Sequence, residues 1–276
     1  MPGPPTLTFL SDYGLQDEFV GVCHGVIARR CPAAHVIDIT HAIPRHDVRG
    51  GALALAAALP YVPAGVHLAV VDPEVGAAGR HARRAVAVQP AAAGQLLVGP
   101  DNGLLSLALQ QLGGAVAAVE IGRSPERLEP VSATFHGRDI FAPVAAALAA
   151  GAPLAGVGEP LPVEELRTLV LPHAELDGVG LRMHVLHVDG FGNVTLDADH
   201  ELLTRAGLRL GEALTLEVAG GTHRARYVST FADLAPGELL LYEDARRAAA
   251  LAVNRGSAAA ALGLERDDEL LARPAP

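Results

Sequence analysis

The first half of the chain alternates short β-branched runs with longer segments rich in Ala and Leu. This alternation is typical of βαβ units, in which helices cover a mainly parallel sheet. Asp47 can begin one of these helices, because its carboxylate can accept hydrogen bonds from the exposed amides of a first turn. The predicted strands are 6–10, 35–39, 66–71, 85–88 and 96–98, and the other predicted helices are 18–30, 103–112 and 138–150.

The pattern changes after about Val170, where short strands separated by Gly and Asp turns replace the longer helical segments. The expected strands are 181–188, 213–218 and 224–228, and one short helix near 256–262 is expected to close the chain. Such a series is typical of a small β-barrel or β-sandwich. The Gly- and Pro-rich segment 151–164 reads as a linker. We therefore expect an α/β domain over residues 1–165 and a smaller β domain over 166–276.

Charge and cysteine content narrow the class of protein. The formal net charge is −10, Arg is the only strongly basic residue type, and the arginines are scattered among more numerous carboxylates. A nucleic-acid partner is not expected, because phosphate binding needs positive charge gathered on one face. Cys23 and Cys31 are too few for a disulfide framework, which favours a cytoplasmic chain with reduced thiols.

No targeting or membrane segment is expected either. Residues 1–5 lack the charged start and apolar core of a signal peptide. The uncharged stretches 50–71 and 140–158 are long enough to be tested as membrane spans, but prolines interrupt both. We interpret each as a buried helix followed by a loop, with a strand completing the first, and expect no membrane partner.

Polar clusters follow several of the predicted strands. They are 11–14, 72–76 and 99–103, and a fourth cluster, 135–139, begins a helix. Each could be only a turn, because Asp and Asn bond their own backbone and Gly accepts a positive φ. In open α/β sheets, however, ligands bind outside the carboxyl ends of the strands. Carboxylates at successive strand ends therefore favour a binding site.

Sequence signatures of metal and nucleotide sites are absent. There is no HExxH, no DxDxDG, no GxGxxG, no GxxxxGK[ST] and no GxSxG. His184 and His187 are three apart on a predicted strand and point to opposite faces, which favours ordinary barrel residues over metal ligands. His41 and His46 flank Pro44 and read as loop residues. We expect no metal site and no cofactor.

Taken together, the polar clusters resemble the S-adenosylmethionine (SAM) hydroxide adenosyltransferases, relatives of the fluorinating and chlorinating enzymes. The matches run in order from residue 7 to about 262. The segments that carry the resemblance are Leu10–Gly14 with Asp17 and Gly21, Ile37–His41 with Ile43 and Pro44, Val70–Pro73 with Val75 and Gly76, Gly99–Gly103, Phe135–Asp139, and Asp189–Asn193.

The resemblance implies an N-terminal α/β domain, a C-terminal β-barrel, and a homotrimer with a small-molecule ligand between subunits. It also implies that water splits SAM into adenosine and methionine by attack at ribose C5′. In that family an Asp, an Arg and a His surround the water, and Asp72 and His136 match two of them. If the sequence is aligned with the family on the strand that begins at Ala85, Arg83 takes the place of the arginine. If residues are counted forward from Asp72 instead, the position falls next to Arg80. We favour Arg83, because strand register is harder to shift than loop length.

The resemblance also implies residues that bind the substrate. Asp12 matches a residue that binds the ribose hydroxyls, and Asp17 belongs to the same opening motif. Phe191 and Asn193 match barrel residues that stack on and hydrogen-bond to the nucleoside. Arg246 resembles an arginine of the halogenating relatives. Arg255 lies in the segment 253–256, whose backbone groups bind the adenine edge in family members. The segment 245–250 departs from the family, which often has a Ser-aromatic-Gly-x-Leu-Glu run there.

The predicted residues suit this reaction. The sulfonium makes C5′ electrophilic and leaves as neutral methionine, so no metal or cofactor is needed. Asp72 or a neutral His136 can take the proton of water, whereas Arg stays protonated and can only stabilise and orient. A carboxylate repels a halide, which favours water over halide as the nucleophile. The alternatives are a halide-dependent adenosyltransferase, a non-catalytic adenosine or SAM sensor, and a metal-dependent phosphoesterase.

Overall fold

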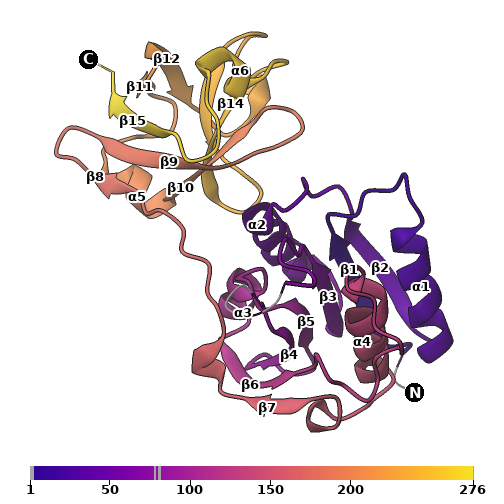
Figure 1. Cartoon of the computed structure of the whole chain (residues 1–276). Helices are drawn as coiled ribbons and strands as arrows, with labels where there is room; N and C mark the ends of the chain where they lie inside the picture. The colour runs from indigo at the N-terminus through magenta and orange to yellow at the C-terminus, as the bar shows by residue number, and fades with distance from the viewer. Residues whose placement is uncertain (1–2, 78, 80–81, 276) are drawn as a thin grey trace. The chain divides into compact units, whose positions relative to one another are not determined.

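The computed structural model describes residues 3–77, 79 and 82–275, and it divides into two compact units, Met1–Leu169 and Val170–Pro276 (Figure 1). The division lies four residues beyond the expected boundary at 165. Backbone hydrogen bonds explain this difference, because the N–H of Arg167 donates to Asp101 Oδ1 and that of Leu169 to Ser106 Oγ. These contacts hold 166–169 on the first unit.

The first unit is built on a seven-stranded sheet with the order β2-β1-β3-β5-β4-β6-β7. Strands β2, β1, β3 and β5 are mutually parallel, while β4 is antiparallel to β5 and to β6, and β7 is antiparallel to β6. Five of the seven strands therefore share one direction, which confirms the mainly parallel sheet. The strands are β1 Thr6–Ser11, β2 His35–Thr40, β3 Val66–Val70, β4 Ala85–Pro90, β5 Leu96–Pro100, β6 Ala115–Glu120 and β7 Glu159–Leu161.

Helices cover both faces of this sheet. Alternate residues of β3 show why, because Leu68 and Val70 join one buried cluster and Ala69 joins another. The first cluster includes α1 and α4, and the second includes α2 and α3. Asp47 caps α2 as expected, accepting from Gly50 N at 2.8 Å. The helices are α1 Phe19–Arg30, α2 Val48–Ala58, α3 Ser106–Gln111 and α4 Ala142–Ala149, with 3₁₀ turns at Leu59–Tyr61, Leu154–Gly156 and Val163–Glu165.

Three expectations for the first unit need correction. The predicted helix 138–150 begins with a π-helical turn, η3 (Gly137–Phe141), before α4. The predicted helix 103–112 is shorter, because 103–105 form turns before α3. The segment 151–164 is not a linker, since it contains β7, which pairs with β6 at the edge of the sheet. Its Pro160 is compatible with a strand there, because an edge residue need not donate to a ladder on both sides.

The second unit is a closed seven-stranded β-barrel, as the resemblance implied. The strands pair in the order β10-β14-β13-β12-β11-β15-β9, and β9 pairs with β10 to close the ring, while β8 adds to β9 from outside. Its elements are β8 Glu175–Leu176, β9 Leu181–Val188, β10 Val194–Asp199, α5 His200–Arg205, β11 Ala213–Val218, β12 Gly221–Tyr227, a 3₁₀ turn Phe231–Asp233, β13 Leu239–Glu243, β14 Ala248–Val253, α6 Ala258–Leu262 and β15 Glu269–Pro274.

The expected end of the chain is wrong, because a strand and not a helix closes it. β15 pairs with β11 and β9, and without it the barrel would have two open edges. Among the described residues, no helix has both the length and the apolar character needed to cross a membrane. Both cysteines, Cys23 and Cys31, are free and buried.

Candidate active site

The sheet topology gathers polar side chains at one edge of the first unit. Because β1, β3 and β5 are parallel, the segments that follow them, which carry Asp12, Asp72 and Asp101, leave the sheet at the same edge. Strand β4 runs the opposite way beside β5, so the residues just before its start reach that edge too. Arg83 and Arg84 precede β4 directly. The antiparallel strand thus brings two arginines to the carboxyl ends of the parallel strands.

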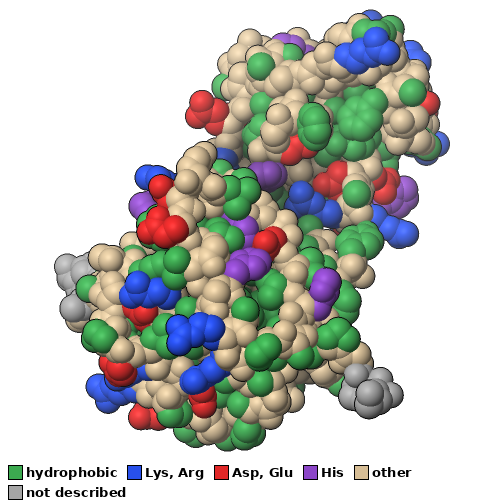
Figure 2. Space-filling view, turned by 90° about the vertical axis from the view of Figure 1, so that its right-hand side faces the viewer, with side chains coloured by type: hydrophobic (Ala, Val, Ile, Leu, Met, Phe, Trp, Pro, Cys, Tyr) green, Lys and Arg blue, Asp and Glu red, His purple; other side chains and the backbone are tan. Residues whose placement is uncertain are grey.

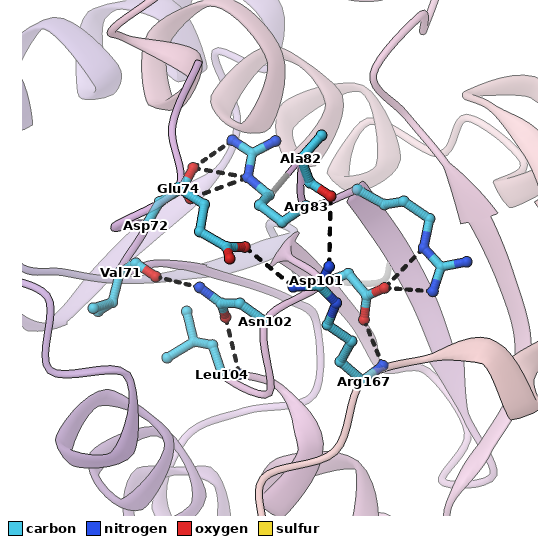
Figure 3. A network of polar contacts seen from close by, with 10 residues as sticks. Val71, Asp72, Glu74, Ala82, Arg83, Asp101, Asn102, Leu104 and Arg167 are labelled. Carbon is cyan, nitrogen blue, oxygen red and sulfur yellow. Dashed lines mark hydrogen bonds and ion pairs between the residues drawn. The ribbon is translucent and has the colours of Figure 1, made fainter. Parts of the chain in front are cut away.

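Asp72, Arg83 and His136 form one connected cluster at this edge. The Arg83 Nε–H donates to Asp72 Oδ1 at 3.0 Å and Oδ2 at 2.9 Å, and Nη2 also donates to Oδ2 (Figure 3). The two side chains are only 5% and 6% exposed. Arg83 Nη2 lies 2.9 Å from His136 Nδ1. The structure therefore joins the three residues that the sequence assigned to the water site, and Arg80 lies outside the described residues.

The arginine determines the state of His136. A guanidinium only donates, so Nδ1 of His136 must accept this hydrogen bond and the ring hydrogen of the neutral imidazole sits on Nε2. Burial and the nearby Arg83 cation lower the pKa of His136, with Asp72 and Asp139 opposing this in part. The imidazole therefore stays neutral at neutral pH and offers an N–H donor on its free side.

Two aromatic residues that sequence reasoning did not single out complete the cluster. The Arg83 guanidinium lies over the Phe141 ring, with Cζ 5.2 Å from its centroid. Tyr13 packs against Phe135 and close to Gly137, where a Cβ would collide with its hydroxyl. Burial raises the pKa of Tyr13 well above its ordinary value, and nearby negative groups including Asp72 add to the effect. Both residues lie in or beside the quoted motifs, but nothing in those motifs pointed to an aromatic role.

The neighbouring Arg84 belongs to a different network. Adjacent residues of an extended chain point in opposite directions, so Arg84 turns away from Asp72. Its Nε donates to Asp101 Oδ2 at 2.9 Å and its Nη1 to Glu165 Oε2 at 2.8 Å. Arg167 ties this network to the loop after Asp72, because its Nη1 donates to Glu74 Oε2 at 3.1 Å (Figure 3). These contacts brace the loop on which Asp72 and Arg83 stand.

Asp139, in the polar segment 135–139, has a structural role. The carboxylate is buried and accepts from Arg138 Nε at 2.6 Å, Arg138 Nη2 at 2.9 Å and Ser132 N at 2.8 Å. Burial alone would raise the pKa of Asp139, but these hydrogen bonds and the Arg138 charge outweigh it and lower the pKa. Asp139 thus fixes the segment before η3, and His136 is the residue of this cluster that joins Arg83.

The predicted ligand residues of the first unit lie on the loops after β1. Asp12 is half-buried, and its Oδ2 accepts from His46 N at 2.9 Å. Asp17 is exposed, two residues before α1. Their predicted roles toward a substrate stay predictions.

In the barrel, the predicted ligand residues lie near the two ends of β14. Phe191 and Asn193 lie between β9 and β10, where Asp189 accepts from both backbone amides and from Asn193 Nδ2. Phe191 is 83% exposed. Val194 pairs with Leu251, so this loop lies at the end of β14 that leads to Arg255.

Arg246 lies beyond the other end of β14. It sits in the turn between β13 and β14, beyond the pairing of Glu243 with Ala249. The five-residue ladder separates the two ends by about 15 Å at the usual rise of a strand. The barrel therefore groups Phe191, Asn193 and Arg255, and holds Arg246 apart from them.

A hollow of about 500 Å³ lies at the opposite edge of the sheet, among the first residues of β1, β3 and β5. It is lined by Gly, Pro, Ala and aliphatic side chains with one threonine and two glutamines, and carries no ionisable side chain. It therefore offers no acid, base or charge for chemistry, and the carboxyl edge remains the candidate active site.

Comparison with known proteins identifies the family. Residues 7–158 match the N-terminal domain of the SAM hydroxide adenosyltransferases, and residues 183–271 match the C-terminal domain. The chain belongs to the SAM hydroxide adenosyltransferase family. The resemblance found in the sequence is confirmed.

Members of this family and their relatives cover nearly the whole chain. The (R)-S-adenosyl-L-methionine hydrolase of Salinispora tropica is 50% identical over 270 residues, covering 98% of both chains. A fluorinase of Actinoplanes sp. is 30% identical over 277 residues, covering 91% of this chain and 92% of its own. An uncharacterized conserved protein of Thermotoga maritima has a similar crystal structure, with a TM-score of 0.87, 34% identity, and 96% and 99% coverage.

The two adjacent arginines should differ in what their loss affects. We expect Arg83→Gln to lower turnover of SAM at least about 100-fold, as loss of a charged stabilising donor does. Arg84→Gln should retain most turnover but lower the free energy of unfolding by about 1.5–3 kcal/mol, because the buried Asp101 loses charged hydrogen bonds. Steady-state kinetics and urea unfolding of both variants measure this. Equal losses of turnover in the two folded variants would contradict the assignment.

Proposed function

We propose that this protein hydrolyses S-adenosyl-L-methionine to adenosine and L-methionine. The observation that carries the proposal is the cluster at the carboxyl edge of the sheet, in which the buried Asp72–Arg83 ion pair contacts the half-buried His136. The name of the 50% identical relative, an (R)-S-adenosyl-L-methionine hydrolase, supports the same substrate and reaction.

The cluster suits the activation of one water molecule. Water attacks ribose C5′, a C5′–O bond forms, and the C5′–S bond breaks with its electron pair passing to sulfur, which leaves as neutral methionine. One water proton must leave during the attack. Asp72 is the acceptor we propose, because a carboxylate keeps free lone pairs beyond those that Arg83 uses. His136 Nδ1 already accepts a hydrogen bond from Arg83, so His136 takes no proton from the water. Its Nε2–H instead orients the water by donating a hydrogen bond to it.

The charge of the cluster favours water over halide. Asp72 and Arg83 cancel, and His136 is neutral, so an uncharged nucleophile adds no charge to a buried site. A halide would bring a negative charge beside a carboxylate. We therefore place the proposed reaction with the hydrolases of the family and not with the fluorinase at 30% identity.

The barrel residues suit an elongated ligand with different ends. Phe191 offers an exposed ring for stacking on a nucleobase, and Asn193 and Arg255 lie at the same end of the β10–β14 pair. Arg246, at the other end, offers a cation for a carboxylate such as that of methionine. We also propose, from the family resemblance, a homotrimer with no metal or cofactor in the reaction. Free buried cysteines support a reducing, cytoplasmic compartment.

The first test follows the oxygen atom of water into the adenosine product. The protein is incubated with each sulfonium epimer of SAM in halide-free buffer containing EDTA and H₂¹⁸O. We expect equimolar adenosine and methionine by chromatography, with ¹⁸O in the adenosine 5′-hydroxyl by mass spectrometry, because water is the nucleophile. A parallel reaction with added chloride should give no 5′-chloro product. Binding of SAM without either product would replace this proposal with a sensor of the same ligand.

The role of Asp72 is tested by removing its charge alone. Asp72→Asn should lower kcat about 10²- to 10⁴-fold, the usual contribution of a general base. Glu74→Gln is the matched control, because it changes a carboxylate of the same loop that faces Arg167 and not Arg83. Steady-state rates of both variants, with circular dichroism to check folding, measure the difference. An active Asp72→Asn variant would contradict the proposed proton acceptor.

The pH profile should report His136. Because burial and Arg83 lower the pKa of His136, the neutral imidazole persists below pH 6.5, the ordinary value for histidine. We expect kcat/KM to hold from neutral pH down past about 6.5 and to fall only as the pH drops through the lowered pKa. NMR titration of the His136 ring in wild-type protein and in Arg83→Gln checks the cause, and the variant should titrate at higher pH. A wild-type ring that titrates at or above 6.5 would contradict it.

A further inference from the structure

A second cluster of ligand-type side chains lies in the first unit, outside the Asp72 cluster. His24 from α1, Asp38 from β2 and His41 directly after β2 bring their ligand atoms within 4.8 Å of one another. His24 Nε2 lies 2.9 Å from Asp38 Oδ1, and His41 Nε2 lies 3.1 Å from the same oxygen. Figure 2 faces the α1 side of the molecule and shows histidine side chains at the surface near acidic ones.

His41 is the unusual member of this cluster. Its side chain is only 2% exposed, and its Nδ1 is held 2.8 Å from Ser11 Oγ. The ring also packs edge-on to Phe9, with centroids 4.6 Å apart. These contacts aim Nε2 at Asp38 Oδ1, 3.1 Å away, but within the part of the chain that the structure describes this buried nitrogen makes no hydrogen bond of good geometry. A buried polar atom in that position normally finds a partner.

The position of the His41 ring hydrogen decides which partner fits. When the ring hydrogen is on Nδ1, where it donates to Ser11 Oγ, the Nε2 lone pair faces Asp38 Oδ1 at 3.1 Å. Two lone pairs that face each other repel, and a cation between them converts the repulsion into two bonds.

We propose that His24 Nε2, a carboxylate oxygen of Asp38 and His41 Nε2 bind one divalent transition-metal ion, with Zn²⁺ as the best match. Two imidazoles and a carboxylate are ligands that zinc takes, and bond lengths of about 2.0–2.2 Å place tetrahedral ligand atoms about 3.3 Å apart. The two imidazole nitrogens lie 2.9 and 3.1 Å from Asp38 Oδ1, close to that value, and within 4.8 Å of each other. His24 and Asp38 are partly exposed, which leaves room for water as a fourth ligand.

The site would brace the turn after β1. His41 contacts this turn twice, because its ring bonds Ser11 Oγ and its backbone carbonyl accepts from Gly14 N at 2.8 Å. Ser11 Oγ also accepts from Tyr13 N at 3.3 Å. A metal that fixes His41 to α1 and β2 therefore holds the segment that carries Asp12. None of its ligands belongs to the Asp72 cluster, so the role is structural and lies outside the proposed reaction.

The experiment uses the full chain, treated with EDTA and then freed of it. Titration calorimetry with zinc sulfate should give about one ion per chain, and Co²⁺ in its place should give the visible absorption bands of a low-coordinate site. His24→Ala should weaken binding at least about 10-fold, since even partners of metal ligands cost that much. His35→Ala, an exposed histidine on β2 outside the cluster, should bind as wild type.

Melting temperature and SAM turnover distinguish the proposed metal site from the proposed hydrolase activity. Zn²⁺ should raise the melting temperature of wild type and of His35→Ala but not of His24→Ala, as binding to the folded state alone requires. SAM turnover in EDTA should persist. Asp38→Asn gives a second variant should His24→Ala fold poorly. Binding that is absent, or that is equal in wild type, His24→Ala and Asp38→Asn, overturns the metal site whether or not the protein hydrolyses SAM.

Discussion

The ion pair between Asp72 and Arg83 is the interaction on which the candidate site depends. Both charges are almost fully withdrawn from water, so each needs the other to avoid an unpaired buried charge. Forming the pair fixes the two ends of the loop between β3 and β4. The Nη2 group of Arg83 then also donates to His136 and decides which of its ring nitrogens carries hydrogen. One pair therefore holds the two ends of this loop together, orients an arginine and sets the tautomer of a histidine.

The direction of one strand makes this pair possible. If β4 ran parallel to β5, the residues before it would emerge at the opposite edge of the sheet, among the aliphatic residues around β1, β3 and β5. Because β4 is antiparallel, its start lies where β3 ends, and Arg83 and Arg84 reach two different carboxylates. The Arg84 network with Glu165 and the Arg167 contact with Glu74 then hold the loop from outside.

Sequence reasoning predicted the α/β class and the barrel, because strand patterns and ordered motifs carry that information, and it favoured Arg83, the arginine that the structure places against Asp72. It missed what depends on distant contacts. The edge strand β7 lies in a Pro-rich segment, and the apolar run of β15 is only three residues, 270–272, between Glu269 and Arg273. His41 read as a loop residue because its partners, His24 and Ser11, come from other elements. The direction of β4 and the π-helical start at Gly137 likewise follow from tertiary pairing.

The charge balance of the cluster connects the fold to the proposed choice of nucleophile. A buried site tolerates a carboxylate only when a cation compensates it, and Arg83 supplies one positive charge for one negative charge. Among these three side chains no positive charge is left to pair with a second anion, and protonating His136 to supply one is opposed by burial and by Arg83 itself. Water enters without changing this balance. The cation that lets Asp72 stay buried is thus already paired, which is the physical basis of the proposed choice of water over a halide.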